Sequence, residues 1–448
     1  MASPTQRLTL ALLLSVLNLS AAPLSLNEAI TLLKEQNLEI KAASLDAKIA
    51  QNDVSLSQGY SYGALDFTQN VVRSNDALNV FGFKLSSREA NFGDFGLAEY
   101  TGDTTTQPKD LNYPGYRNLF QSKLTYAIPL YTGGKLSSYE KIAQQMEKIK
   151  QLDTTKVTAE KIYEIRKSYY DMALLDHSID KLQVIQKNIA TLQAATQQMF
   201  QEGYAKKVDL LEVEAKKANV DRMILEMQAN KKLLYHYLSF LLNQKVSDIV
   251  TPSDDRASAA ITEADVMANN SDLKKASHGL EIRSSMIDVA TAPYLPTVGA
   301  FAEASSADNT FLGKFSDHAA YTIGARLSWN LYNGGIDAHT LEKARIDHLK
   351  TSTEVELAKK GIALQYDKIQ TEIESLDYQV SSLEKELDLS TQIYKNYEGR
   401  YREHLTSMSD LIIKQSQQIE KIINLQMVKN QRNERIFALE KLSYGANQ

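Results

Sequence analysis

The residues of this 448-residue chain that could perform chemistry are few and scattered. The stretch "PLYTGGKLSS" ends like a phosphate-binding loop, but Pro129 stands where such a loop has its first glycine. Leu136 follows the lysine in place of the required serine or threonine. The seven histidines show no His-Glu-x-x-His spacing, and the chain has no cysteine that could bind a metal as thiolate. We therefore expect no enzyme activity, no catalytic residue, no cofactor and no metal.

Two aspartates lie in similar surroundings far apart in the chain. Asp209 belongs to "FQEGYAKKVDLL" and Asp410 to "YREHLTSMSDLI", and in both cases an apolar pattern resumes next to the aspartate. An aspartate at such a place commonly caps the start of a helix. The matching surroundings indicate that the chain contains a repeat.

The repeat runs through most of the chain. "LYTGG" at 130–134 and "LYNGG" at 331–335 are 201 residues apart, which is also the separation of the two aspartates. A continuous helix explains the constant separation, because one inserted residue would rotate everything beyond it by about 100°. A weaker match pairs Asn37 with Asn270 at a separation of 233 residues, so the first copy carries 32 extra residues. The sequence predicts two repeats, which cover residues 23–244 and 245–448.

A long helical pattern follows each Gly-Gly pair. Lys135 to Glu202 contains no proline or glycine, and its apolar residues recur every three or four positions. Residues 336–403 show a similar pattern. Each pattern breaks at a polar stretch and then resumes, which predicts helical hairpins over residues 135–244 and 336–445. Runs of this length are typical of coiled coils. One unbroken rod is the alternative, but Gly203 favours a turn.

The residues before each Gly-Gly alternate between apolar and polar side chains. "FQSKLTYAIPLY" (120–131) and "YTIGARLSWNLY" (321–332) keep a period of two over about ten residues, as strands of a membrane barrel do. Two fainter strands, "YGALDFTQNVV" and "PTVGAFAEASS", precede them. A half-exposed sheet of a soluble protein is the alternative for any single strand. The expected strand pairs cover about residues 60–131 and 294–332.

The first 22 residues are typical of a secretory signal peptide. Arg7 is their only charge, Leu8 to Leu19 is apolar, and Ser20-Ala21-Ala22 offers small residues for cleavage. A buried N-terminal helix is the alternative. No other run approaches the ~18 apolar residues of a membrane helix, so an inserted part would consist of β-strands. The net charge of −5 argues against nucleic acid as a partner.

Four strands cannot close a barrel, because both edges of the sheet would lie open in lipid. Several subunits must therefore share one barrel. In such an arrangement each Gly-Gly pair lies where a strand becomes a helix, and glycine supplies the dihedral freedom for the change of direction. The expected strand-to-helix junctions are Gly133, Gly134, Gly334 and Gly335.

With these features the chain resembles the TolC-like outer-membrane efflux protein family over essentially all of residues 23–448. The resemblance rests on the repeat, the paired "PLYTGG" and "NLYNGG" junctions, and the two aspartate-containing motifs. It implies a mainly α-helical homotrimer with a membrane β-barrel, in which 12 strands continue into a 12-helix coiled-coil tunnel in the periplasm. Members are passive exit ducts in outer-membrane lipid, and a periplasmic adaptor (membrane fusion) protein couples them to an inner-membrane pump or type I secretion ATPase. The competing expectation is a periplasmic coiled-coil adaptor or structural protein without a barrel.

The resemblance also assigns roles to the ends of the two helical hairpins. In the family, these tips form the adaptor-docking surface and the closed periplasmic gate. Asp410, and less directly Asp209, match the gate aspartates, whereas His404 and Ile413 depart from the family pattern. The expected adaptor-docking residues are Phe200, Gly203, Tyr204, Lys206, Lys207, Tyr401, Arg402, His404 and Thr406.

The extra residues of the first repeat fall between its two strands, at about 73–118. Barrel loops on the outside of the cell are the longer ones, so this segment is expected to face outside. It either folds over the barrel mouth or packs on a neighbour, or it is surface variation. It has many aromatic residues for a purely solvated loop: Phe81, Phe83, Phe92, Phe95, Tyr100 and Tyr113.

Overall fold

The computed structural model describes residues 23–252, 257, 260–311, 313–403 and 405–443. The expected signal peptide, residues 1–22, and His404 lie outside the described residues. The chain divides into two compact units. We call them the hairpin unit (Met1–Ser44, Asp153–Ser271 and Lys359–Gln448) and the sheet unit (Leu45–Leu152 and Asp272–Ala358). Each unit contains segments of both halves of the sequence.

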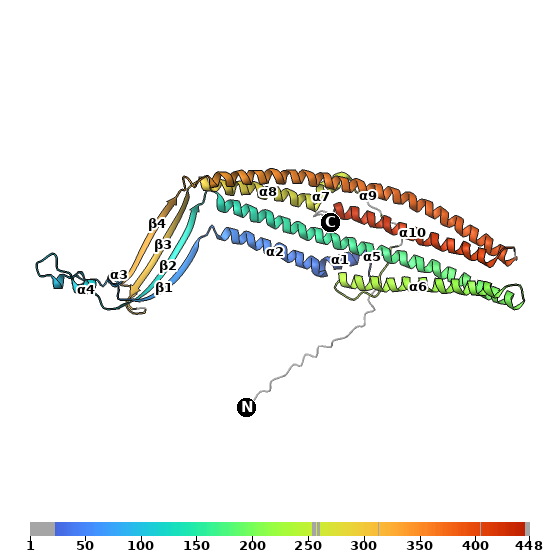
Figure 1. Ribbon diagram of the computed structural model, residues 1–448, viewed down its shortest axis with the longest axis horizontal. Coiled ribbons are helices and arrows are strands. Elements are labelled where there is room, and N and C mark those ends of the chain that lie inside the picture. The colour runs from blue at the N-terminus through green and yellow to red at the C-terminus, as the bar shows by residue number, and fades with distance from the viewer. Residues whose placement is uncertain (1–22, 253–256, 258–259, 312, 404, 444–448) are drawn as a thin grey trace, which may run out of the picture. The chain divides into compact units, whose positions relative to one another are not determined.

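The main elements of the two halves follow the same order (Figure 1). Helices α5 and α9 each contain 67 residues, and both their first and their last residues are 201 positions apart. The first half contains α1 (Leu26–Gln36), α2 (Leu38–Gly59), β1 (Ala64–Ser74), β2 (Arg117–Tyr131), α5 (Lys135–Gln201) and α6 (Lys207–Leu241). The second contains α7 (Glu263–Asn269), α8 (Ser271–Thr291), β3 (Thr297–Asp308), β4 (Ala319–Ser328), α9 (Ile336–Arg402) and α10 (Met408–Ser443).

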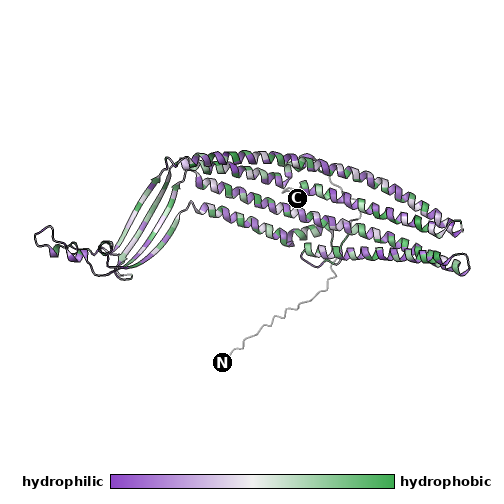
Figure 2. Ribbon diagram, viewed as in Figure 1, coloured by the Kyte–Doolittle hydropathy of each residue, from purple (hydrophilic) through white to green (hydrophobic). Residues whose placement is uncertain are grey.

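The sheet unit contains an antiparallel sheet in the order β1-β2-β3-β4. Apolar residues pair across neighbouring strands on one face, as Phe67 does with Leu124 and Ala302 with Ile323. Figure 2 shows the alternation of apolar and polar residues along the strands. The described residues leave the apolar face uncovered, since Phe67 is 67% and Ile323 is 76% exposed. An uncovered apolar sheet face needs an apolar surrounding or a partner.

The last strand is shorter than the sequence predicted. Alternation extends to Tyr332, but β4 ends at Ser328. The reason is that β3 begins at Thr297, which pairs with Ser328, so later residues have no β3 residue opposite them. Trp329 lies beyond the strand end, and its indole N–H donates to the Tyr294 carbonyl at 3.1 Å. In contrast, β2 continues to Tyr131, as predicted.

The segment between β1 and β2, which was expected to fold over the barrel mouth, to pack on a neighbour or to be surface variation, has secondary structure of its own. It contains α3 (Ala77–Ser86), two 3-10 turns (η1, Phe92–Phe95; η2, Leu97–Glu99) and α4 (Lys109–Asn112). Phe81 and Phe95 pack edge to face with ring centroids 5.0 Å apart. Helix α3 packs on β2 and β3, so the segment rests on the end of its own sheet.

The hairpin unit holds the two helical hairpins and their core. Toward the ends of the hairpins, α5, α6, α9 and α10 share one apolar cluster that includes Leu182, Val220, Tyr394 and Leu411. The helices in the described residues contain no stretch that is long and apolar enough to cross a lipid bilayer. Because one cluster draws on all four helices, the two hairpins pack as a single body at this end.

A buried asparagine makes the same contact in each half of the chain. Asn37 lies between α1 and α2, and its side chain donates to the Leu241 carbonyl at 2.8 Å. Asn270 lies between α7 and α8 and donates to the Leu442 carbonyl at 2.9 Å. In each half, this bond connects the point where one helix ends and the next begins to the last turn of the return helix, which is α6 in the first half and α10 in the second. The weak sequence match between these asparagines therefore corresponds to a shared structural role.

Candidate functional site

The tip of the first hairpin is a tight helix C-terminus. Gly203 has a φ of +84°, in the left-handed region that favours glycine. Its N–H donates to the Phe200 carbonyl at 3.1 Å, and the Tyr204 N–H donates to the Met199 carbonyl at 2.8 Å. These two bonds form a Schellman motif, which ends α5 and satisfies its last carbonyls.

The tip of the second hairpin repeats the outer bond of this motif. The Leu405 N–H donates to the Arg400 carbonyl at 2.8 Å, and these residues lie 201 positions after Tyr204 and Met199. Chain reversal thus uses the same backbone contact in both hairpins. The gate and docking candidates of both repeats lie at these turns.

Both candidate gate aspartates are the third residue of the helix that follows the turn. The Asp209 carboxylate accepts from the Lys206 backbone N–H at 2.8 Å. The exposed Asp410 carboxylate accepts hydroxyl hydrogen bonds from Ser407 at 2.6 Å and Thr406 at 3.3 Å. The Ser407 bond holds the pKa of the Asp410 carboxyl below its usual value, so the group remains charged at neutral pH.

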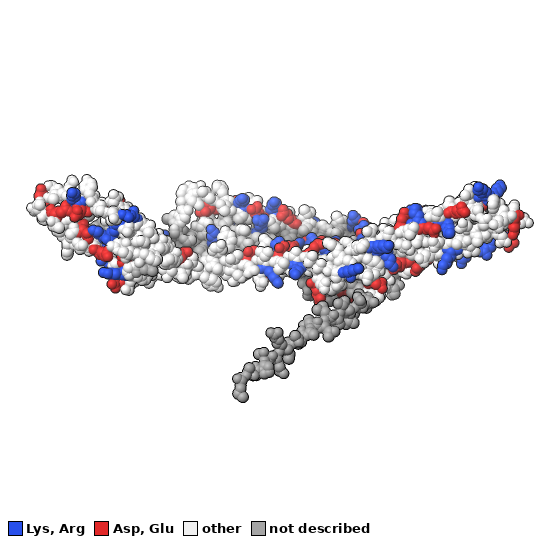
Figure 3. Space-filling model, turned by 90° about the horizontal axis from the view of Figure 1, so that it is seen from below, with Lys and Arg blue, Asp and Glu red and all other residues white. Residues whose placement is uncertain are grey.

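Several candidate docking residues lie on the surface of the tips. Tyr204 is 74% exposed, Phe200 is 38% exposed, and Lys206 and Lys207 are exposed. Arg402 is also exposed and forms an ion pair with Glu398 at 2.8 Å. Figure 3 shows atoms of both charge signs gathered at this end of the hairpins. The tips therefore combine exposed apolar residues with solvated charges.

Tyr401 does not lie on this surface, in contrast to the expectation from the sequence. It is only 7% exposed, and its hydroxyl lies 3.4 Å from the Thr196 hydroxyl and 3.6 Å from the Met199 sulfur. A tyrosine in this position packs between the hairpins and cannot contact a docked protein directly. Its role at the tip is to join α9 to α5.

Two further contacts across the hairpins were not predicted from the sequence. The Ser409 hydroxyl donates to a Glu212 carboxylate oxygen at 2.8 Å, and the Lys216 ammonium donates to the Ser416 hydroxyl at 2.6 Å. Burial lowers the pKa of Lys216. These pairs link α6 to α10 just beyond the turns, and no local sequence signal marks them because the partners are about 200 residues apart.

The strand-to-helix junctions differ in packing, although their backbones are similar. All four glycines have positive φ, with +64° at Gly133 and +73° at Gly334. A Cβ atom on Gly133 would lie 2.6 Å from the Ala292 carbonyl oxygen, whereas one on Gly334 would meet no atom within 4 Å. Glycine is thus required at the first junction by both space and conformation, and at the second by conformation alone.

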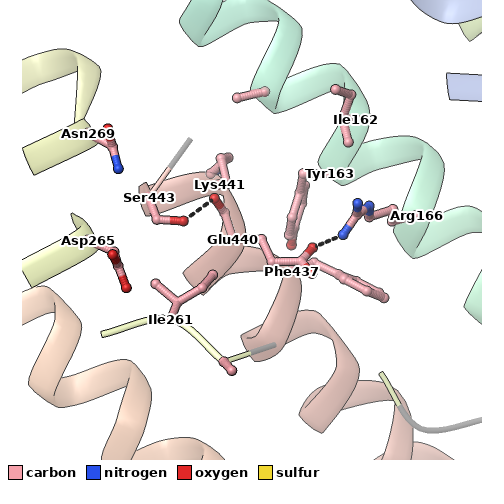
Figure 4. A pocket seen from close by; sticks show the side chains of 12 residues that line it. Ile162, Tyr163, Arg166, Ile261, Asp265, Asn269, Phe437, Glu440, Lys441 and Ser443 are labelled. Carbon is pink, nitrogen blue, oxygen red and sulfur yellow. Dashed lines mark hydrogen bonds and ion pairs between the residues drawn. The ribbon is translucent and has the colours of Figure 1, made fainter. Parts of the chain in front are cut away.

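A cavity of about 470 Å³ lies between α5, α7 and α10 in the hairpin unit (Figure 4). Arg166 forms an ion pair with Glu440 in its wall, and Lys441 lies over the Tyr163 ring at 4.9 Å from the centroid. Burial raises the pKa of Tyr163 to about 12 and also raises that of Glu440. The charged groups are engaged with one another, so the cavity wall joins the three helices and offers no activated nucleophile. No group of three potential metal ligands occurs among the described residues.

The comparisons with known proteins agree with this architecture. The family model described as "Outer membrane efflux protein" matches residues 29–244 and 264–443. The chain is similar in structure to CusC, with a TM-score of 0.78 at 14% identity over 94% of this chain and 92% of that chain. It is similar to the open state of the MtrE outer membrane channel of Neisseria gonorrhoeae, with a TM-score of 0.75 at 14% identity, over 94% and 89%.

A third similar structure is the outer membrane protein VceC of Vibrio cholerae, with a TM-score of 0.76 at 14% identity over 94% and 96% of the two chains. At these identities the likeness shows the fold. A sequence comparison with curated proteins finds no significant match.

The family model covers most of the chain in two segments, one in each half. Members of this family are channels of the outer membrane with a periplasmic helical extension, and they are not enzymes. The expectations from the sequence of an outer-membrane protein without catalytic activity are therefore confirmed. This chain belongs to the outer membrane efflux protein family.

Proposed function

We propose that three copies of this chain form the exit duct of a tripartite efflux or type I secretion system. The duct passes substrate passively from an inner-membrane pump or ATPase, through a periplasmic adaptor, to the outside. Each copy contributes four strands to a 12-stranded barrel in outer-membrane lipid and two hairpins to a 12-helix tunnel. Residues 23–244 and 245–448 are the two repeats of this design, and residues 1–22 are the export signal.

The open edges of the sheet are the observation that carries the proposal. Within the described chain β1 pairs only with β2, and β4 pairs only with β3. In lipid, unpaired edge groups would each cost several kcal/mol, so neighbouring copies must supply the missing strands. Three copies of the order β1-β2-β3-β4 bring each β4 next to a β1, and the barrel then has no free edge.

The two faces of the sheet support the same arrangement. The uncovered apolar face suits contact with lipid, and the other face carries the ion pair of Lys123 with Glu303, whose Nζ and Oε2 atoms are 2.5 Å apart. A polar face toward a water-filled lumen and an apolar face toward lipid is the pattern of outer-membrane barrels.

The hairpin tips are the proposed adaptor-docking surface. They offer exposed aromatic and aliphatic side chains, such as Tyr204 and Leu405, beside the cations Lys206 and Lys207. Aromatic anchors surrounded by solvated charges are typical of protein interfaces. Tyr401 supports this surface from within rather than contributing to it.

The tips are also the proposed gate. In a trimer, three Asp410 carboxylates would lie around one axis, with three Asp209 carboxylates in the equivalent turns. Asp410 is exposed and its local bonds favour the charged form, so such a ring would attract cations. The resting duct should therefore conduct weakly, prefer cations and be blocked by divalent cations from the periplasmic side.

Single-channel recording of the purified protein in planar bilayers tests this function. Asp410→Ala should weaken divalent block and shift selectivity toward neutral, while the size of the detergent-purified complex stays unchanged. Asp388→Ala serves as a matched control, because Asp388 is an exposed aspartate of α9 that accepts a hydrogen bond from Gln392 at 2.8 Å away from the turn. If Asp410→Ala keeps wild-type selectivity and block, Asp410 is a helix cap only.

A further inference from the structure

The segment between β1 and β2, residues 75–116, is held in a fixed shape by polar contacts; we call it the insert. Lys84 forms an ion pair with Asp94. The Glu99 carboxylate accepts the backbone N–H groups of Lys109 at 2.7 Å and Asp110 at 2.9 Å. These bonds fix α4 against the 3-10 turns, so the insert is a small folded module with a defined surface.

The base of the insert is fixed by one arginine of β2. Arg117 donates to the Ser87 hydroxyl at 3.1 Å and forms an ion pair with Glu89. Its side chain is only 15% exposed, and its Nε atom is buried without a hydrogen-bond partner among the described residues. The guanidinium is thus committed to the base of the insert, and its buried Nε–H does not open into solvent.

A cavity of about 830 Å³ opens between the insert, the start of β2 and the turn that follows β3. Its size is within the range of sites for small molecules. All of its walls belong to the sheet unit. The polar residues that carry the argument are Lys84, Asp94, Asp110, Arg117, Asn118 and Asn309.

Several hydrogen-bonding groups of the cavity are not used by the protein itself. The side-chain amides of Asn118 and Asn309 make no hydrogen bond with the described residues, and each amide offers both donors and acceptors. The Asp110 carboxylate is exposed and adds acceptor oxygens. The wall of the cavity therefore offers both donors and acceptors to a ligand.

Both cations of the cavity wall are already paired. Lys84 pairs with Asp94 and Arg117 with Glu89, and Asp110 adds an exposed carboxylate, so the wall does not favour an anion. An uncharged ligand with many hydroxyl groups suits such a wall, because each hydroxyl donates one hydrogen bond and accepts up to two. This pattern favours a sugar over a phosphate, a metal ion or an apolar compound.

We propose that this cavity binds a saccharide, with the side-chain amides of Asn118 and Asn309 bonding its hydroxyl groups. Figure 1 shows the insert, marked by α3 and α4, at the end of the strands away from the helices of the sheet unit. In the proposed membrane orientation this end faces outside the cell. The sugar can therefore be the headgroup of a lipid in the outer leaflet or a free oligosaccharide.

Glycan binding by the detergent-purified full-length protein tests the proposal. One arm uses an array of immobilised oligosaccharides that contains glucans, chito-oligosaccharides and lipid-free core oligosaccharides of lipopolysaccharide. The second arm uses nanodiscs with and without intact lipopolysaccharide. The wild type should bind at least one sugar class, and the double variant Asn118→Leu with Asn309→Leu should bind it at least tenfold more weakly. Binding in the second arm, with or without binding of the core oligosaccharides, assigns the site to a lipid headgroup, and binding of sugars in the first arm without binding in the second assigns it to free sugar.

Asn79→Leu is the matched control, because Asn79 is an exposed asparagine of α3 that does not line the cavity. This variant should bind like the wild type. Single-channel conductance of the double variant should also be unchanged, since neither substitution touches the hairpin tips. Wild-type protein that binds no sugar in either arm, or a double variant that binds as well as the control, would overturn the proposal without affecting the duct function.

Discussion

The two halves of the chain share one backbone plan but satisfy it with different side chains, and the strand-to-helix junctions show this best. Both junctions use glycines with positive φ to leave the sheet and begin a 67-residue helix. At Gly133 the backbone of Ala292 fills the space that a side chain would need, whereas Gly334 lies in open space. The repeat therefore preserves dihedral angles more strictly than packing.

The turns at the hairpin tips lead to the same conclusion. Both hairpins reverse through the same backbone bond, but the following helices are capped differently. In the first, the Asp209 carboxylate accepts the Lys206 backbone N–H, and in the second the Ser407 hydroxyl accepts the Asp410 backbone N–H at 3.1 Å. Side chains at equivalent positions can thus diverge as long as each satisfies the helix start.

The largest effect should come from placing valine at the junctions. Gly133→Val adds a steric clash with the Ala292 carbonyl to an unfavourable φ, so we expect loss of most assembled protein. Gly334→Val adds only the conformational strain, of about 1–3 kcal/mol, and should reduce assembly less. Size-exclusion chromatography of detergent-purified membranes measures the yield. Gly361→Val, in the middle of α9 with no atom near the added Cβ, is the control. Equal yields from both junction variants would show that packing at Gly133 is unimportant.

The second effect concerns the paired asparagines. Asn37→Leu and Asn270→Leu each leave a buried carbonyl without its donor and should destabilise the fold by about 1–3 kcal/mol. Because both asparagines make the same bond, the two variants should lower the thermal unfolding midpoint by similar amounts. A large effect from one variant and none from the other would show that the two asparagines do not have equivalent structural roles.

A smaller effect is expected at the first tip. Gly203→Ala forces a side chain into the left-handed region at a place with no steric obstacle, which costs about 1–2 kcal/mol. The strain is local, so hydrogen exchange at the Tyr204 amide should become faster while the assembled yield stays normal. Unchanged exchange would mean that the Schellman turn adapts without glycine.

The smallest effect is the acid sensitivity of the second tip. Hydroxyl bonds lower the pKa of Asp410 in the folded state, so the charged form contributes stability above the ordinary pKa of the group. This contribution is lost as pH falls through the lowered folded pKa. Hydrogen exchange at the start of α10 should therefore be faster in Asp410→Asn than in the wild type at pH 7, and the difference should shrink in strong acid. A difference that grows with acidity would contradict this assignment.

Periodicity was sufficient to locate most elements from the sequence. Strong alternation predicted β2, and the unbroken apolar pattern from Lys135 predicted α5, because both signals repeat over many residues. The constant separation of 201 residues also predicted the matching turns of the two hairpins. Long regular elements are predictable since each residue adds to the same signal.

Features that depend on distant partners could not be predicted. Trp329 continues the alternation but leaves the sheet because β3 begins too late to pair with it. Tyr401 stands near a polar turn, and only the packing of α9 against α5 explains its burial. The helices of the insert are too short for a clear period, and the free amides of Asn118 and Asn309 are recognisable only once the turn after β3 lies beside β2.

The mass of the detergent-purified complex tests the central claim most directly, since a four-stranded sheet with two open edges and an uncovered apolar face requires neighbours in the membrane. Native mass spectrometry should give three chains of about 50 kDa, less any cleaved signal, in one stable particle. A monodisperse monomer that retains its β-structure by circular dichroism would contradict the shared barrel.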